Sequence, residues 1–467
     1  MSSIGVKLTP DSKDYEDVRT RFFNKRVPAD KPAAIYQPTT TAEVAAILKD
    51  ASTANHKVGV RSGGHLFVCA SLVEGGLLID TSKLNRSIDY DSATKVVAFS
   101  PSHRVHELTA ELGALKRFFP WGHSPDVATG GFLLAGGQGL FARGWGYTSG
   151  SWITQLEVVT AKGEIVLCNK KENADLFWAA PGSGRGYFGV ITRIWAKTIP
   201  SRRTFDTTII VDSTDIFKPL LKWILETSDK TPKYGVDLFF LTFRSDMDQP
   251  GDGDVSDEKR IMFVINSTIW ADSLEEAKVL ASPWDALPEE FAKFQVQRIP
   301  IQERSWKEIW AAQERFQPSG NGERWNVDSI MADPNVSNDE LIDAITPALY
   351  ELPTRLSTGT VCPMDYYPDE ADQALSLPQK CYVSAMNCWR DPKNDASNDA
   401  WIQRVFAKAE SAGCGIYVAD VVENGRAAPV MTPTALEKWL KIRAHWDPEE
   451  RFIGHRAFTR SGVDGRT

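Results

Sequence analysis

Glycine is concentrated in three loops within residues 58–192, and this clustering restricts how the N-terminal half of the chain can fold. The loops lie in residues 58–65, 122–146 and 175–192, each beside apolar runs. In the first loop, Gly63 and Gly64 permit positive φ and let an oxygen atom approach the backbone without an intervening Cβ. Three unrelated turns are the simpler alternative, but turns rarely need so many glycines in apolar surroundings. We therefore expect a long ligand that lies against backbone N–H groups.

Two side chains beside the first loop suit a cofactor that contains a pyrophosphate. Arg61 can offer a forked cation to a phosphate. His65 follows the two glycines, where its imidazole can meet the bound cofactor. Further along, the chain contains the segments Gly122–Gly131, Gly136–Gly139 and Asp175–Thr192 in that order. The combined order is specific, whereas each motif alone is not.

The order Arg-Ser-Gly-Gly-His, Gly-x-x-Pro-x-Val-x-x-Gly-Gly, Gly-Gly-x-Gly and Leu-Phe-Trp-Ala resembles the vanillyl-alcohol-oxidase/p-cresol-methylhydroxylase flavoproteins, most closely their berberine-bridge-enzyme-like oxidases. The resemblance is strong from about Pro32 to Pro200 and returns in Trp446–Phe452. It implies an α+β flavoprotein of two domains. An FAD-binding domain of mixed α+β subdomains is expected in residues 1–200. A substrate domain with a large antiparallel sheet backed by helices is expected in residues 201–430, and a segment that returns to the first domain in 431–467.

The resemblance also implies FAD held covalently, through a bond from the His65 imidazole to the flavin 8-methyl group. A free imidazole is an adequate nucleophile near neutral pH because its pKa is about 6.5. The residues expected to contact FAD are those of the glycine loops and their neighbours: Val60, Arg61, Ser62, Gly63, Gly64, His65, Ser124, Val127, Ala128, Thr129, Gly130, Gly131, Gly136, Gly137, Gly139, Tyr147, Gly189 and Val190.

The chain departs from the family pattern at several positions. Many berberine-bridge-like members form a second flavin bond from a cysteine where this chain has Ser124. A hydroxyl without an activating base is a poor nucleophile, so we expect single attachment. Tyr187 and Ala419 stand where the family commonly has asparagine, and Gly150 stands where it has an acidic residue. The family's substrate contacts are therefore not carried over to this chain.

The expected activity is a two-electron oxidation of a small secondary-metabolite alcohol or amine, with O2 as acceptor and H2O2 as product. Small residues at 128–131 leave room for oxygen beside the flavin, which favours an oxidase. A carbohydrate substrate is disfavoured, because sugar oxidases of this family usually carry both flavin bonds. An alcohol also needs a base, and Tyr366, Tyr367 and Tyr417 are the expected catalytic residues. The alternative for each is an ordinary core or loop aromatic.

Other activities are compatible with the same motifs. An oxidative cyclase would form a ring or C–C bond after hydride transfer. A non-redox cyclase would use the flavin fold only as a scaffold. A reductase fed by a nicotinamide cofactor is disfavoured, because the sequence shows no second dinucleotide loop.

The composition of the chain bears on its binding partners and on its cellular compartment. The formal net charge is −8 with no basic block, which disfavours nucleic acid and anionic membrane surfaces as partners. No stretch approaches the roughly 20 apolar residues that span a bilayer. The N-terminus lacks the apolar core of a secretory signal, so we expect a cytoplasmic protein. Six cysteines at no metal-like spacing predict free thiols and no metal site. The sequence does not indicate an oligomeric state.

Hydrophobic periodicity and turn residues predict a mixture of short strands and helices. Helices are expected at residues 12–23, 41–51, 104–112, 273–280, 401–412 and 433–443. Strands are expected at residues 33–36, 57–61, 77–80, 96–99, 156–160, 165–167, 207–211, 238–243, 260–265, 381–386 and 416–422. The polar stretch Asp246–Asp257 predicts an exposed hairpin tip.

Overall fold

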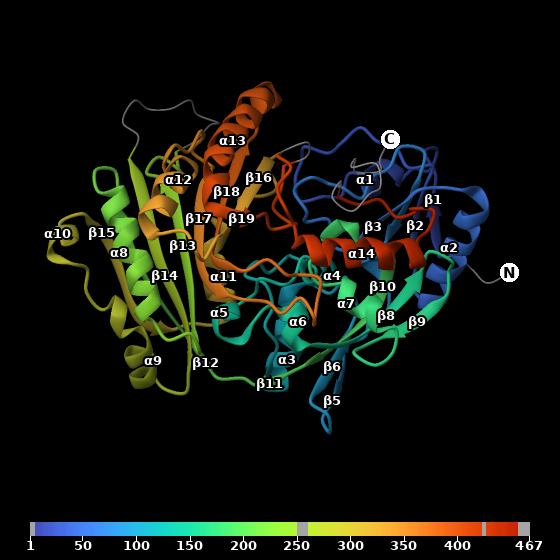
Figure 1. The fold of residues 1–467 in the computed structure, drawn as a ribbon, viewed down its shortest axis with the longest axis horizontal. Coiled ribbons are helices and arrows are strands. Elements are labelled where there is room, and N and C mark those ends of the chain that lie inside the picture. The colour runs from blue at the N-terminus through green and yellow to red at the C-terminus, as the bar shows by residue number, and fades with distance from the viewer. Residues whose placement is uncertain (1–4, 250–259, 423–425, 456–467) are drawn as a thin grey trace.

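The computed structural model describes residues 5–249, 260–422 and 426–455 (Figure 1). Its N-terminal half contains a four-stranded sheet and a five-stranded sheet, and its C-terminal half contains an eight-stranded antiparallel sheet. The predicted α+β class, with a large antiparallel sheet backed by helices, is confirmed. None of the described helices is both long enough and apolar enough to cross a lipid bilayer.

The four-stranded sheet leads directly to the first glycine loop. Its strands in spatial order are β1 (Val6–Leu8), β2 (Ala34–Gln37), β4 (Leu77–Asp80) and β3 (Val58–Arg61). Strand β4 lies parallel to both neighbours and is completely buried, which explains its continuous apolar run. Strand β3 ends at Arg61, so the chain enters the glycine loop from a fixed, buried strand.

The five-stranded antiparallel sheet supplies the third glycine loop. Its strands in spatial order are β5 (Asp89–Asp91), β6 (Val96–Phe99), β10 (Gly189–Lys197), β8 (Ile153–Thr160) and β9 (Ile165–Cys168). A short pair, β7 (Arg117–Phe118) with β11 (Ile199–Pro200), lies nearby in sequence. Helices in this half are α1 (Tyr15–Arg19), α2 (Thr41–Ala54), α3 (Val105–Ala114), α4 (Thr129–Leu134), α5 (Ala142–Trp145), α6 (Thr148–Trp152) and α7 (Ala174–Ala179).

The eight-stranded sheet has two different faces. Its strands in spatial order are β15 (Gln295–Glu303), β12 (Arg203–Asp212), β14 (Ile261–Ala271), β13 (Val236–Arg244), β17 (Thr358–Tyr366), β18 (Gln379–Trp389), β16 (Arg324–Ala332) and β19 (Gly413–Gly415). Successive side chains of a strand point to opposite faces. Phe240 and Val361 pack with helices on one face, whereas Leu241 and Phe243 belong to a separate cluster on the other.

Three helices pack against one of these faces (Figure 1), whereas Gln313 of the later helix α11 (Trp306–Glu314) lines a cavity on the other face. The covering helices are α8 (Phe217–Lys230), α12 (Asn338–Tyr350) and α13 (Asp395–Ala409), and α9 (Leu274–Ala281) packs near the sheet edge. In α8, Leu220, Leu221 and Ile224 are fully buried against the sheet at helical spacing. Two further helices, α10 (Glu289–Ala292) and α11 (Trp306–Glu314), flank β15 in sequence. The other face is therefore left to contact the N-terminal half.

The C-terminal part of the chain packs on the N-terminal half at two places. Helix α14 (Pro433–Trp446) packs on α7, and Trp439 Nε1 donates to Ser183 Oγ at 2.7 Å. Beyond it, Phe452 forms a parallel bridge with Val58 at the start of β3. The C-terminal segment thus returns to the N-terminal sheets, as Figure 1 shows for the red helix.

Asn24 connects the N-terminal segment, the first glycine loop and the large sheet. Its Nδ2 donates to Phe67 O at 2.5 Å and to Trp325 O at 2.9 Å, and its Oδ1 accepts from Trp325 N at 2.9 Å. Asn24 is 1 % exposed, so these groups have no access to bulk water. The loop that carries His65 is in this way joined to strand β16.

Two sequence-based elements differ from the structure. The helix expected at 12–23 is only Tyr15–Arg19, because the chain then turns to let Phe23 N donate to Gly64 O. The strand expected at 416–422 is a loop, in which Asp420 N donates to Tyr417 O across a turn. Buried apolar side chains in that loop mimic a strand pattern. The hairpin of β13 and β14 is present, and most of its predicted tip, residues 250–257, lies outside the described residues.

We expect Asn24→Ala to lower the free energy of unfolding by about 2–4 kcal/mol, because it removes four hydrogen bonds, including one from Arg26 N, and leaves buried partners unsatisfied. Chemical denaturation measures the change. Asn335→Ala, at an exposed turn, is the control and changes stability by no more than about 0.5 kcal/mol. An Asn24→Ala protein with unaltered stability would contradict this account of the connection.

Candidate active site

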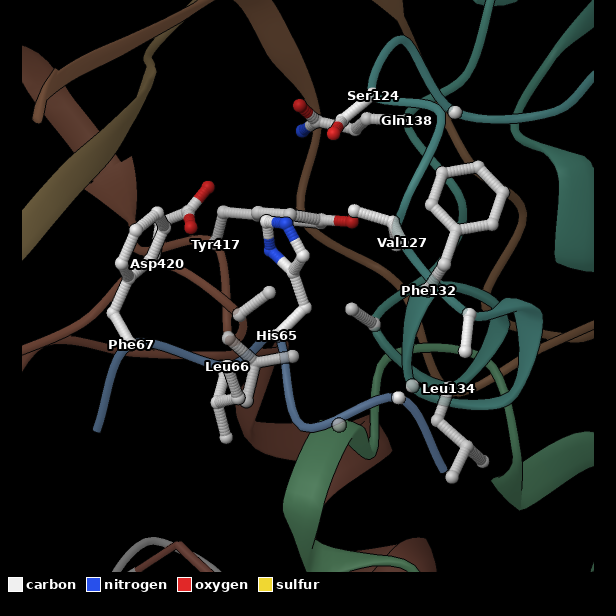
Figure 2. Close-up of a pocket in the computed structure, with 18 of the residues that line it drawn as sticks. His65, Leu66, Phe67, Ser124, Val127, Phe132, Leu134, Gln138, Tyr417 and Asp420 are labelled. Carbon is white, nitrogen blue, oxygen red and sulfur yellow. The ribbon is translucent and has the colours of Figure 1, made fainter. Parts of the chain in front are cut away.

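One cavity of about 390 Å³ lies where the glycine loops meet the face of the large sheet that is opposite to α8, α12 and α13. Figure 2 shows His65, Ser124, Val127, Tyr417 and Asp420 around it, contributed by different parts of the chain. Residues expected to contact FAD that line this cavity are Val60, Arg61, Ser62, Gly63, Gly64, His65, Ser124, Val127, Ala128, Gly130, Gly131, Gly139 and Gly189.

The first glycine loop packs directly on the turn before α4. A Cβ on Gly63 would lie 2.6 Å from the Ala128 Cβ, a distance that no side chain tolerates, and Gly64 has a φ of +68°. Among the described residues, no hydrogen-bond acceptor is bound to the N–H groups of Gly63 or Gly64. A Cβ on Gly131 would meet only open space in the cavity. The two loops therefore present free backbone donors beside room for a ligand.

His65 points from this loop into the cavity (Figure 2). Its ring stacks on Phe23 with a centroid distance of 4.2 Å and an interplanar angle of 17°. Phe67 contacts the same ring edge-on at 6.3 Å. Burial lowers the pKa of His65 to about 4, and the positive charge of Arg104 acts in the same direction. The imidazole is therefore neutral at pH 7 and keeps a lone pair available.

Arg61 does not offer its guanidinium to the cavity, which corrects the sequence-based expectation. Its Nη2 donates to Asp80 Oδ2 at 2.9 Å and to Val18 O at 2.7 Å. The two residues are register partners on β3 and β4, and their side chains are 3 % and 2 % exposed. The cation is used inside the protein because a neighbouring strand places a buried carboxylate beside it.

Four other expected FAD contacts lie outside the cavity lining. Thr129 turns inward and donates to the carbonyl oxygens of residues 100 and 101. Gly136 and Gly137 have φ values of +115° and +77° and pack on Leu375 and Thr148, so they form a structural turn. Val190 belongs to the opposite side of β10 from Gly189.

The aromatic pair Tyr147 and Tyr366 is also outside the cavity lining. The two rings stack at 4.2 Å with an interplanar angle of 3°, and Tyr366 OH accepts from Gln373 Nε2 at 2.7 Å. Tyr367 is 64 % exposed. Tyr366 and Tyr367 are therefore not among the residues that line this cavity, and their catalytic role stays a prediction.

Ser124 lines the cavity beside Gln138 (Figure 2). The neighbouring His123 also lines it, and its Nε2 lies 2.8 Å from Asp237 Oδ2 on β13. Cys362 is a cysteine of the cavity lining that the sequence patterns did not single out. Burial raises the pKa of its thiol well above the ordinary value, so Cys362 stays protonated and is a poor nucleophile.

Tyr417 and Asp420 reach the cavity from the loop after β19. Tyr417 is the one expected catalytic tyrosine that lies there, and burial raises the pKa of its phenol. Asp420 Oδ2 accepts from Tyr382 OH at 2.5 Å. Burial raises the pKa of Asp420 to about 6, and the hydrogen bond from Tyr382 acts in the opposite direction. Sequence reasoning missed Asp420, although a lone acidic residue inside the apolar run 416–422 was a detectable signal.

Known proteins resemble this chain in sequence and in fold. The FAD binding domain family matches residues 32–169. The FAD-linked oxidoreductase janO of Penicillium janthinellum is 31 % identical over 447 residues, which covers 94 % of each chain. The chain is an FAD-linked oxidoreductase. The resemblance to the vanillyl-alcohol-oxidase/p-cresol-methylhydroxylase family and its berberine-bridge-enzyme-like branch is thereby confirmed.

Solved structures share the fold of this FAD-linked oxidoreductase at low sequence identity. The 6-hydroxy-D-nicotine oxidase of Arthrobacter nicotinovorans has a TM-score of 0.79 and 18 % identity, covering 97 % of this chain and 98 % of its own. A xylooligosaccharide oxidase from Myceliophthora thermophila has a TM-score of 0.73 and 19 % identity, covering 96 % and 95 %. The shared fold extends over both halves, including the large sheet.

The cavity fits FAD. Free N–H groups at Gly63 and Gly64 suit its pyrophosphate, and the open space beside Gly131 accommodates a planar ring without a Cβ in the way. When bound, FAD supplies a two-electron acceptor. The guanidinium of Arg61 is held by Asp80, so at the first glycine loop the backbone N–H groups are the donors that would hold a phosphate.

We expect Arg61→Met to destabilise the protein by about 3–5 kcal/mol, because it leaves the Asp80 carboxylate buried and unpaired. Thermal unfolding of flavin-free protein in a His65→Ala background measures this effect, and Asp80→Asn in the same background is the matched partner variant. If Arg61→Met left the stability of the flavin-free protein unchanged but weakened its binding of added FAD, Arg61 would instead be a phosphate-binding residue.

Proposed function

We propose that this FAD-linked oxidoreductase is an oxidase with FAD bonded to His65. The observation that carries the proposal is the neutral His65 ring, stacked on Phe23 and aimed into the same cavity as the Asp420 carboxyl. The substrate is a small secondary-metabolite alcohol or amine. It loses two electrons and two protons, and O2 takes them up as H2O2.

His65 is suited to covalent attachment by its position and its protonation state. One imidazole nitrogen would bond to the flavin 8-methyl carbon. This bond would release the imidazole N–H hydrogen and one methyl hydrogen as two protons and two electrons, which O2 would accept as H2O2. A pKa of about 4 keeps the ring in the nucleophilic, neutral form throughout the physiological range. Stacking on Phe23 restricts the ring orientation and so limits the entropy lost on bond formation.

A single attachment follows from the other groups in the cavity. Ser124 has a hydroxyl where a second bond would require a thiolate. Cys362 has a thiol, but burial raises its pKa and keeps it protonated. Both residues line the cavity. The low nucleophilicity of the hydroxyl and of the protonated thiol is therefore the reason that we expect no second bond to the flavin.

Asp420 is the base that the geometry favours for an alcohol substrate. A carboxyl with a pKa of about 6 is ionised at pH 7 and accepts a proton readily. Tyr417, with a raised pKa, remains a neutral phenol and can only donate a hydrogen bond. Tyr382 donates to Asp420 and fixes the orientation of its carboxylate.

We expect acid-precipitated protein to stay yellow and to carry the mass of FAD on the peptide that contains His65. His65→Ala would lose this adduct and release its flavin, while Phe132→Leu, elsewhere in the cavity lining, would keep it. Peptides that contain Ser124 or Cys362 would have unmodified masses. Complete flavin release from the unmodified protein would refute attachment at His65, and an adduct on Cys362 would refute single attachment.

We expect Asp420→Asn to slow flavin reduction by about 10²–10⁴-fold without loss of flavin. In the unmodified protein the rate should rise with pH through about 6 and then level, because the carboxylate form is active. The assay is anaerobic bleaching of the flavin by the most reactive member of a panel of alcohols. Tyr417→Phe is the comparison and should act less strongly. An unchanged rate and pH profile in Asp420→Asn would place the base elsewhere.

A further inference from the structure

The face of the large sheet opposite to α8, α12 and α13 contributes one wall of the cavity that His65 also lines. Phe239 and Leu241 on β13 and Met386 on β18 give this wall an apolar surface. The strand register places Leu241 beside Thr360 and Met386 beside Thr358. An apolar wall therefore surrounds two hydroxyl groups on the central strand, β17.

Thr358 and Thr360 have no hydrogen-bond partner for their Oγ1 atoms within the described part of the chain. Each residue is 1 % exposed, and both line the cavity. They are two positions apart on one strand, so their side chains share one face, about 7 Å apart along β17. Buried hydroxyls without partners are unfavourable, and a ligand in the cavity that both residues line can satisfy them.

The remaining polar groups of this wall are already paired. Asp237 accepts from Phe141 N at 2.7 Å and contacts His123 Nε2 at 2.8 Å. Tyr382 OH donates to Asp420. Within the described residues, the cavity lining contributed by the large sheet contains no lysine, arginine or histidine. This wall therefore contributes no cation of its own, and the arginines that line the same cavity, Arg143 and Arg185, belong to other segments.

We propose that the substrate is a neutral, largely apolar molecule whose hydroxyl or carbonyl group binds Thr358 and Thr360. Its body lies on Phe239, Leu241 and Met386, with its oxidisable carbon toward the flavin side of the cavity. The two threonines are specificity-determining residues: they bind one polar group of a largely apolar molecule and so favour it over an oligosaccharide. This inference rests on the proposed oxidase function, because it names the substrate class of the same site.

The test measures binding by the change in flavin absorbance under anaerobic conditions. The probes are geraniol, its hydrocarbon counterpart myrcene, and the sugar xylobiose. We expect geraniol to bind more tightly than xylobiose. Thr358→Val and Thr360→Val keep the shape of the side chain and remove the hydroxyl. Loss of one neutral hydrogen bond predicts weaker geraniol binding, by up to about tenfold in the affected variant, with unchanged myrcene binding.

The matched control is Thr242→Val. Thr242 is buried on the neighbouring strand β13, and its Oγ1 donates to Leu349 O on the helix-covered side. We expect this variant to lose stability and to retain the geraniol affinity. Equal effects of the Thr358 and Thr360 variants on geraniol and myrcene would overturn the proposal, as would tighter binding of xylobiose or no binding of geraniol. Threonine-dependent binding of geraniol by a protein whose flavin no substrate reduces would support the pocket assignment and refute the oxidase function.

Discussion

The close packing of the first glycine loop on the turn before α4 is the constraint on which the site depends. Gly63 meets Ala128 at a separation that leaves no room for a Cβ. Gly63 and Gly64 line the cavity, and among the described residues their N–H groups have no acceptor. The same contact sets where His65 leaves the loop. A ligand site built from backbone donors requires this geometry more than it requires any charged side chain.

The N-terminal segment converts that loop into part of a two-sided cavity. Phe23 stacks on the His65 ring, and Asn24 bonds both to the loop, at Phe67, and to strand β16, at Trp325. The cavity-lining face of the large sheet is thereby held near the loop that carries His65. Helices α8, α12 and α13 cover the other face, so the apolar alternation along each strand separates a structural core from a ligand-facing wall.

Burial then assigns protonation states to the groups in the cavity. It lowers the pKa of His65 and raises those of Tyr417, Cys362 and Asp420. His65 is neutral, Tyr417 and Cys362 keep their protons, and Asp420 titrates closest to neutral pH. Burial in one low-dielectric cavity therefore gives these groups different roles: His65 is a nucleophile, Tyr417 and Cys362 are protonated donors, and Asp420 is a proton acceptor.

The sequence by itself determined the glycine loops, the position of His65, the FAD-binding family and the large antiparallel sheet, because these depend on local backbone freedom and on periodicity. It did not determine what Arg61 binds, since Asp80 is adjacent only once β3 and β4 pair in register. It also did not reveal Asp420 or the threonines of β17, whose chemistry depends on which face of a strand or loop turns toward the cavity. Tertiary packing decided these roles, because burial and pairing between distant segments fix whether a polar side chain serves the fold or the ligand.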